Sequence, residues 1–548
     1  MLVIVSALNI VPTSAITTAR TSAGTINGIK YTGTDATAFL SIPFAKPPVA
    51  ELRFAPPQPY NETFPDHTLN ATVPAPSCIQ FGTALLEPPP KSEDCLYLDV
   101  YVPPNATSCS KLPVKVFIYG GGETAGGISD PLYDGCNLAA NGAIFVSVNY
   151  RLGPLGFLAL ESAGIGGNFG IQDILLGLQW VQKNIAAFGG DPKKVLLFGQ
   201  SAGAVNVHTV ATLPEAPSLI DAAITESGGG RDAAISSSVN AVGAQYATAL
   251  GCGTHNLSCL RSKSPFELNA TFPSHGIGGL NFLPYVDGTI IPAQPSEVGV
   301  QVPTIFGFNS MDGALFIYFP FPNSTTATPA DYTHFLSTNF GPLAPQILKT
   351  YPLSTYNSSA FTAMATLYTD YSFRCPAYRG LTLAASKGVP AWAYRFSVRP
   401  SCPWLSFVPG NALLGLGATH TAELPYVFGN TQNLPVPNGT CDLPAAEQDI
   451  SRQLIAAWTA MAAEGDPNAS GLRWPRYTPD DQLGLVIGNE GIAVGEIDPS
   501  LCEFWEGIYA AQLEEAEKGN GNLTNANGLL VPGPAGGGGG GGGAAAAG

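Results

Sequence analysis

Charged side chains are scarce in this chain of 548 residues. They make up 12% of the sequence, against about 25% in soluble proteins at large. Lys and Arg number 24 and Asp and Glu 40, which gives a formal net charge of −16. Nucleic acids and anionic membranes attract basic faces, so this balance argues against both as partners. Disorder throughout is excluded, because hydrophobic residues reach 45%.

Several other features are missing. No uninterrupted apolar run approaches the ~18 residues of a transmembrane helix, so none is expected. None of the ten cysteines forms a CxxC motif with a histidine pair at zinc spacing. The glycine run at 120–122 is not followed by a GK[ST] motif, and Glu123 would repel phosphate. We therefore expect neither a metal ion nor a cofactor.

The N-terminus and the cysteines predict export. Residues 1–19 are apolar and end in small residues, although the first basic residue is Arg20. We interpret them as a signal peptide cleaved after Ala15 or Ala19; the alternative is an N-terminal strand. An even cysteine count in such a protein favours disulfides over free thiols.

Ten Asn-x-Ser/Thr sequons agree with a secreted, extracellular glycoprotein. They begin at Asn61, Asn70, Asn105, Asn256, Asn269, Asn323, Asn357, Asn438, Asn468 and Asn522.

The alternation of strand and helix patterns predicts an α/β fold. Short β-rich apolar runs occur at 96–102, 112–120, 143–150, 194–199, 302–308 and 391–398. Such runs are typical of a mostly parallel sheet that is buried on both faces. A helix is expected over 171–190, with Asp173 in its first turn, and another near 446–464.

We expect one domain over residues 20–515, because no linker interrupts it. Residues 519–548 contain eight consecutive glycines and four alanines, which predict a flexible tail.

The segment Gly199-Gln200-Ser201-Ala202-Gly203 is a GxSxG motif. It follows an apolar strand and precedes a run of small residues suited to a helix. A serine on such a sharp turn is exposed as a nucleophile. The alternative, a glycine-rich turn with a bystander serine, does not explain this setting.

A serine nucleophile needs a base, and the base needs an acid to orient it. The chain order Ser, acid, His places the histidine late in the sequence. His420 lies in a turn-rich segment, whereas the rival His334 lies in a helix-like one. Asp312 follows a predicted strand, whereas the rival Asp287 is more typical of a turn. From the residues alone, both choices stay open.

A second loop should supply backbone N–H groups to a substrate oxygen. Tyr119-Gly120-Gly121-Gly122 follows a predicted strand and fits an HGGG-type oxyanion loop. Glycine lets the backbone approach the substrate without obstruction by a Cβ atom.

Four groups of motifs make the chain resemble the type-B carboxylesterase/lipase family, which includes cholinesterases and fungal lipases. They are EDCLYL at 93–98, the serine pattern at 188–203, the core segments at 149–153 and 167–173, and the histidine region at 420–429. The resemblance spans about residues 20 to 510. It implies an α/β-hydrolase fold, with a central mostly parallel sheet flanked by helices and with large insertions, that hydrolyses carboxylic esters.

The resemblance also implies the roles of individual residues. Ser201 is then the nucleophile, His420 the base and Asp312 the acid, at a position where many members have Glu. The oxyanion N–H groups would come from Gly121, Gly122 and Ala202. The chain departs from the family at Gln200, where Glu is common, and at Glu123, where an aromatic residue is common. Glu123 is therefore expected at the mouth of the pocket.

Three disulfides follow from the same resemblance: Cys78–Cys95, Cys252–Cys259 and Cys375–Cys502. The remaining four cysteines are paired only by elimination, Cys402 with Cys441 and Cys109 with Cys136.

The first disulfide loop guides the choice of substrate. Residues 79–94 contain no tryptophan, which in the family's cholinesterases receives a quaternary ammonium, so choline esters are not expected. Phe81, Leu85 and Leu86 precede three prolines, from which we expect a short, stiff rim and a preference for soluble, short-to-medium acyl esters. The alternatives are a lipase or sterol esterase and, less favoured, an inactive adhesion-type relative. The sequence does not determine the oligomeric state.

Overall fold

A computed structural model describes residues 16–82, 90–272, 282–432, 434–436 and 439–517. The predicted tail, the first fifteen residues, and Leu85 and Leu86 of the expected rim lie outside these ranges.

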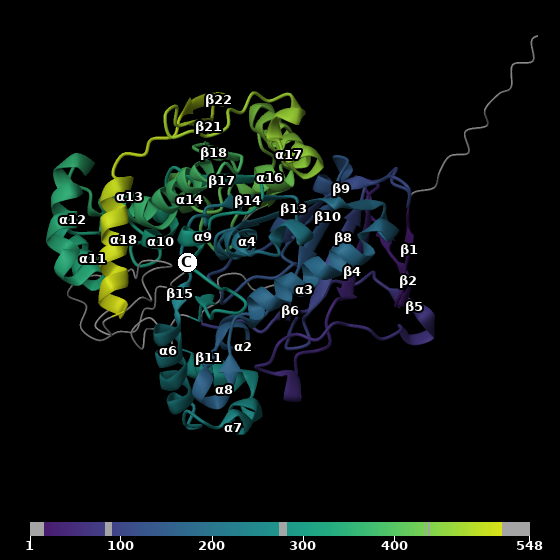
Figure 1. The fold of residues 1–548 in the computed structure, drawn as a ribbon. Coiled ribbons are helices and arrows are strands. Elements are labelled where there is room, and N and C mark those ends of the chain that lie inside the picture. Colours follow the sequence, from purple (N-terminus) through teal and green to yellow (C-terminus); the bar gives the residue numbers. More distant parts are fainter. Residues whose placement is uncertain (1–15, 83–89, 273–281, 433, 437–438, 518–548) are drawn as a thin grey trace, which may run out of the picture.

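One 11-stranded sheet organises the chain, in the order β22-β21-β18-β17-β14-β13-β9-β10-β8-β4-β3 (Figure 1). Its strands are β3 (Ile29–Lys30), β4 (Thr37–Pro43), β8 (Tyr97–Val102), β9 (Leu112–Ile118), β10 (Ile144–Val148), β13 (Gly190–Gln200), β14 (Ala222–Glu226), β17 (Thr304–Asn309), β18 (Ala391–Phe396), β21 (Leu483–Gly488) and β22 (Gly491–Glu496).

The middle of the sheet is parallel and its edges are antiparallel. Strands β10, β9, β13, β14, β17, β18 and β21 run parallel to their neighbours, while β8, β4 and β3 on one side and β22 on the other pair antiparallel. Every residue of β10, β14 and β17 is buried, as their continuous apolar runs predict. The predicted α/β-hydrolase architecture is confirmed.

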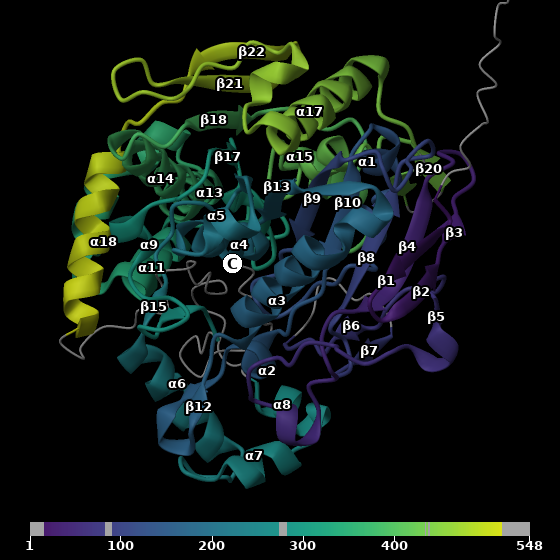
Figure 2. The same ribbon diagram turned by 45° about the vertical axis from the view of Figure 1, so that its right-hand side comes forward.

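Helices cover both faces of these strands. Helix α4 (Ala202–Thr212) packs on β13 and β14, and α17 (Ala445–Glu464) packs on β9 and β13. The two helices lie on opposite sides of the strands in both views (Figures 1 and 2). The remaining longer helices are α3 (Phe169–Asn184), α6 (Ser236–Ala249), α8 (Pro265–Thr271), α10 (Gly313–Tyr318), α11 (Pro329–Phe340), α12 (Ala344–Thr350), α13 (Ala360–Thr369), α14 (Cys375–Ser386) and α18 (Cys502–Glu517).

The helix expected over 171–190 is shorter and begins earlier. It is α3, and a 3₁₀ turn (Ile185–Phe188) carries the chain on to Gly189 at φ 85°. Asp173 does not stabilise an exposed helix start. It is buried and accepts hydrogen bonds from the backbone N–H and the guanidinium of Arg151.

The start of the fold bears on the predicted signal peptide. Strand β1 (Thr18–Thr21) pairs with β2 (Gly24–Asn27), and Ala19 within it is 1% exposed. Cleavage after Ala15 therefore leaves this strand whole, whereas cleavage after Ala19 divides it.

Four of the five expected disulfides are present: Cys78–Cys95, Cys252–Cys259, Cys375–Cys502 and Cys402–Cys441. The fifth, Cys109–Cys136, is wrong, because both are free thiols. Cys109 is exposed on the loop before β9, whereas Cys136 is buried at the start of α1 (Cys136–Ala140), near Thr34 and Asp134. The two cysteines were paired in the prediction only because the other eight already had partners.

In the part of the chain that the structure describes, no helix is long and apolar enough to cross a membrane.

Candidate active site

The turn at Ser201 has the strained geometry that its motif predicts. Strand β13 ends at Gln200, Ser201 takes φ 59° and ψ −130°, and α4 begins at Ala202. A Cβ atom on Gly203 would lie 2.1 Å from the carbonyl oxygen of Ile118. Only glycine lets the helix start this close to β9. The backbone N–H of Ser201 donates to the Glu226 carbonyl oxygen at 2.9 Å, which holds the turn on β14.

His420 and Asp312 meet because their two loops pair. The Met311 N–H donates to the Ala418 carbonyl oxygen at 3.0 Å, beside a bridge between Met311 and Thr419. The His420 Nδ1 atom then lies 2.8 Å from Asp312 Oδ1. An acceptor on Nδ1 favours the tautomer in which Nδ1 carries the proton and Nε2 is free to accept one.

Asp312 is held by three donors. Besides His420, its Oδ2 atom accepts from the Asn309 N–H at 2.7 Å and from the Ser227 hydroxyl at 3.0 Å. The side chain has no exposed surface. Both donors were missed from the sequence. Ser227 is 85 positions from Asp312, and Asn309, three positions away, donates through its backbone N–H, which no residue type marks.

The rival acid and base lie elsewhere. Asp287 accepts from the backbone N–H groups of Thr289, Ile290 and Ile291, as a turn-forming residue does. His334 is exposed on α11. Among the described residues, neither makes a hydrogen bond with the Ser201 turn.

The far side of the His420 ring lies next to the serine turn. Its Nε2 atom is 3.3 Å from the side-chain amide nitrogen of Gln200, the residue before Ser201. The rings of Phe316 and Phe373 pack on the imidazole with centroids 5.0 and 4.9 Å away. No hydrogen bond joins His420 to the Ser201 hydroxyl among the described residues; such contacts are often loose before a substrate is bound.

The glycine loop lies directly against this turn. A Cβ atom on Gly120 would be 2.8 Å from the Cβ atom of Ser201. Gly121 and Gly122 adopt φ 124° and 64°. The Gly121 carbonyl oxygen accepts from Thr124 and Ala125, so it is turned away. Within the described chain, the N–H groups of Gly121 and Gly122 donate no hydrogen bond, which leaves them available to a substrate oxygen.

The Ala202 N–H is at the first position of α4, where helix N–H groups have no intrahelical acceptor and the helix dipole favours negative charge. The structure thus brings together all six residues that the sequence singled out: Ser201, Asp312, His420, Gly121, Gly122 and Ala202.

Glu123 is not at a pocket mouth, contrary to expectation. It is 2% exposed, and its Oε2 atom accepts from the Asn206 side-chain amide at 3.3 Å. Because Asn206 is on α4, the side chain turns inward behind the glycine loop. Burial raises the pKa of Glu123 to about 8.

Two further buried carboxyls lie near the site. Glu423 accepts from the Asn309 side-chain amide, and burial together with the charge of Asp312 raises its pKa to about 8. Glu226 accepts from Trp458 Nε1 at 2.9 Å, and burial raises its pKa well above the usual range. A pKa of about 8 favours the neutral form of Glu423 near neutral pH, and burial shifts Glu226 in the same direction, so both effects reduce the negative charge around His420.

Among residues whose placement is described, no group of three His, Cys, Asp or Glu side chains could hold a metal ion.

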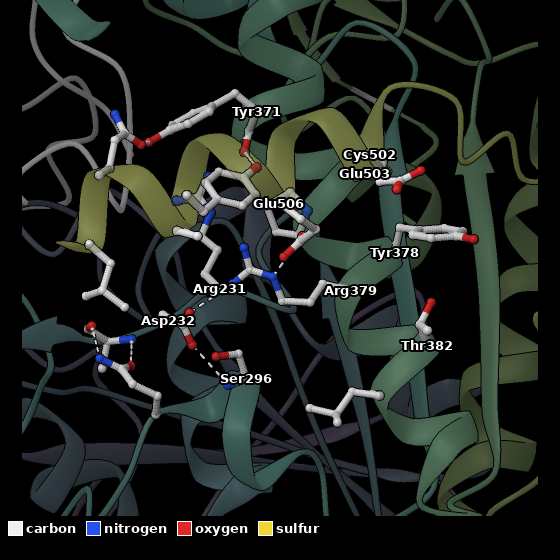
Figure 3. Close-up of a pocket in the computed structure, with 18 of the residues that line it drawn as sticks. Arg231, Asp232, Ser296, Tyr371, Tyr378, Arg379, Thr382, Cys502, Glu503 and Glu506 are labelled. Atoms are coloured by element: carbon white, nitrogen blue, oxygen red, sulfur yellow. Dashed lines mark hydrogen bonds and ion pairs between the residues drawn. The ribbon is translucent and has the colours of Figure 1, made fainter. Parts of the chain in front are cut away.

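A separate cavity of about 690 Å³ lies between α14, α18 and α9 (Pro295–Val298) (Figure 3). Arg379 lies between Asp232 and Glu506 and is ion-paired to both, at 2.9 and 3.0 Å. Ser201 and His420 do not line this cavity.

Comparisons with known proteins agree with this geometry. The profile described as "Carboxylesterase family" matches residues 15–505. The chain is 33% identical to a cholinesterase of Mus musculus, over 90% of this chain and 87% of that protein. It is 33% identical to the para-nitrobenzyl esterase of Bacillus subtilis, over 82% and 90%, and 33% identical to a liver carboxylesterase of Sus scrofa, over 86% and 89%.

Proposed function

Because the chain belongs to the carboxylesterase family, we propose that it is a serine carboxylic ester hydrolase that acts through an acyl-enzyme on Ser201. The observation that carries the proposal is the His420–Asp312 pair at 2.8 Å, with the other imidazole nitrogen facing the residue before Ser201. This is the order of groups that activates a serine hydroxyl.

The reaction is a double displacement. His420 Nε2 takes the hydroxyl proton as Ser201 Oγ attacks the ester carbonyl carbon. The carbonyl oxygen becomes an oxyanion and accepts from the N–H groups of Gly121, Gly122 and Ala202. The imidazolium then protonates the leaving alcohol. Water repeats these steps on the acyl-enzyme, which releases the acid and restores Ser201.

Soluble, short-to-medium acyl esters are the proposed substrates. The Cys78–Cys95 loop is short, and Phe81 in it is buried against Phe272 instead of being presented as part of an apolar flap. The loop has no tryptophan, which argues against choline esters despite the similarity to a cholinesterase. A lipase or sterol esterase is the alternative.

A secreted, glycosylated state is the proposed setting. Four disulfides require an oxidising compartment. Seven sequon asparagines are exposed: Asn61, Asn70, Asn105, Asn256, Asn323, Asn357 and Asn468. Asn269 is half-buried, while Asn438 and Asn522 lie outside the described residues. N-terminal sequencing of protein from culture medium should find a start at Ile16.

The direct test is S201A assayed with p-nitrophenyl acetate. Turnover should fall to the background of the uncatalysed reaction, and a fluorophosphonate probe should label only the wild type. Unchanged turnover in S201A would contradict the assignment. An inactive adhesion-type protein would show neither turnover nor labelling in the wild type.

A series of p-nitrophenyl esters of increasing chain length separates the substrate alternatives. We expect kcat/KM to peak at short or medium acyl chains. A sharp rise in rate above the critical micelle concentration of a long-chain ester would instead support a lipase.

A further inference from the structure

Glu123 is the one carboxyl on the glycine loop, directly after Gly122. Its backbone takes φ 60°, and its carbonyl oxygen accepts from the Gly153 N–H at 2.5 Å. Its side chain reaches Asn206, one turn beyond the start of α4. The residue therefore connects the oxyanion loop to the helix that begins at the nucleophile.

The atoms of this contact leave two oxygens unsatisfied. Asn206 Nδ2 donates to Glu123 Oε2. The other oxygens of the pair, Glu123 Oε1 and Asn206 Oδ1, are both fully buried and have no hydrogen-bond partner among the described residues. Two acceptors without a donor are costly in a buried site. One proton on Glu123 Oε1 would remove both deficits, because that O–H can donate to Asn206 Oδ1.

We propose that Glu123 is a positioning residue that works as a neutral carboxylic acid, paired to the Asn206 amide by two hydrogen bonds, and that it holds the oxyanion loop against α4. The inference rests on the proposed esterase function. In this form the loop keeps the Gly121 and Gly122 N–H groups aimed at the substrate oxygen. Loss of the proton breaks one hydrogen bond and places a negative charge beside the oxyanion.

The surroundings of Glu123 fit this protonated form. Within the part of the chain that the structure describes, the titratable groups around it are the hydroxyls of Tyr119 and Tyr150, and no cation acts on it. The Tyr150 hydroxyl donates to the Tyr119 carbonyl oxygen at 3.0 Å and also lies close enough to Glu123 to lower the pKa of that carboxyl, but the effect of burial is larger. Burial raises the pKa values of both tyrosines, so neither ionises before Glu123 as the pH rises. Glu423, on the histidine side of the site, is another buried acid whose pKa is raised to about 8.

The experiment compares E123Q and E123A with the wild type, measuring kcat/KM for p-nitrophenyl acetate from pH 6 to 9.5. Glutamine reproduces both hydrogen bonds of the neutral acid and cannot ionise. We expect E123Q to stay within about twofold of the wild type at pH 7, and E123A to lose about tenfold, mainly in kcat, as a loosened oxyanion hole should. Between pH 7 and 9.5 the kcat/KM of the wild type should fall about tenfold, whereas that of E123Q should not fall.

Two controls give the result its meaning. E423Q, which removes the other acid with a pKa of about 8, should keep the alkaline loss. The second control is the double variant E123Q/N206A, in which the glutamine at position 123 has lost its partner on α4. Its kcat/KM should be as low as that of E123A. The proposal would be overturned if E123Q still lost kcat/KM at alkaline pH. It would also be overturned if E123Q/N206A kept the activity of E123Q. The pH profile of E123Q decides the matter even if E123A does not fold. A wild type that neither turns over nor reacts with a fluorophosphonate would instead overturn the esterase function.

Discussion

Two buried carboxyls flank the Ser201 turn, and their surroundings differ. Asp312 accepts hydrogen bonds from His420, Asn309 and Ser227. Glu123 accepts from Asn206 and has the Tyr150 hydroxyl close by, and burial raises its pKa to about 8. Both residues are almost without exposed surface. Burial alone therefore does not decide what a carboxyl does, because its role also depends on which groups its oxygens meet: the base in one case and the helix behind the glycine loop in the other.

The largest effect is expected when Asp312, the carboxyl that meets His420, is replaced by an amide. D312N should lower kcat about 10³–10⁴-fold, because an amide neither fixes the productive tautomer of His420 nor stabilises its protonated form. D287N is the matched control and should keep near-normal turnover, since Asp287 accepts from the backbone of its own turn and from the Asn168 side chain, and not from His420. Steady-state kinetics with p-nitrophenyl acetate checks both; loss of activity in D287N alone would show that the acid is misassigned.

A milder change removes one donor from Asp312. S227A deletes the hydroxyl at 3.0 Å from Oδ2 and should lower kcat about tenfold, since hydrogen bonds to charged groups contribute about 1.5–3 kcal/mol. Ser147 offers a matched control, because its buried hydroxyl has no partner among the described residues. S147A should therefore keep the wild-type kcat. Equal losses in the two variants would mean that the Ser227 contact does not matter.

The smallest effect on turnover is expected at Lys115, a buried charge outside the site. It donates only to the Thr459 hydroxyl, and burial lowers its pKa to about 7. The folded pKa is below the unfolded value of 10.5, so the unfolded chain binds the extra proton between these pH values, and stability rises with pH across that window. K115M should leave kcat unchanged.

Urea unfolding at two pH values tests this linkage. At pH 6 we expect K115M to exceed the wild type in free energy of unfolding by roughly 3–5 kcal/mol, and by pH 9 the gap should narrow to roughly half. A gap that is the same at both pH values would contradict the linkage.

Much of the fold was readable from local pattern. The apolar runs at 96–102, 112–120, 143–150 and 302–308 all contain strands of the central sheet, because a strand buried on both faces needs little besides continuous apolar residues. Gly189 ends a helical stretch, as glycine at positive φ does. The predicted disulfide between Cys109 and Cys136 was wrong, because pairing by elimination takes no account of where the thiols lie: Cys109 is exposed and Cys136 is buried.

The sequence by itself determined the sheet, the strained serine turn and the residue types of the site, since each depends on neighbours a few positions apart. Only the tertiary structure decided which carboxyl meets His420, which serine supports that carboxyl, and that Glu123 turns inward to Asn206. The Ser227–Asp312 contact joins residues 85 positions apart, the His420–Asp312 contact 108 and the Glu123–Asn206 contact 83. Packing of the whole sheet, and no local spacing, brings such groups to hydrogen-bonding distance.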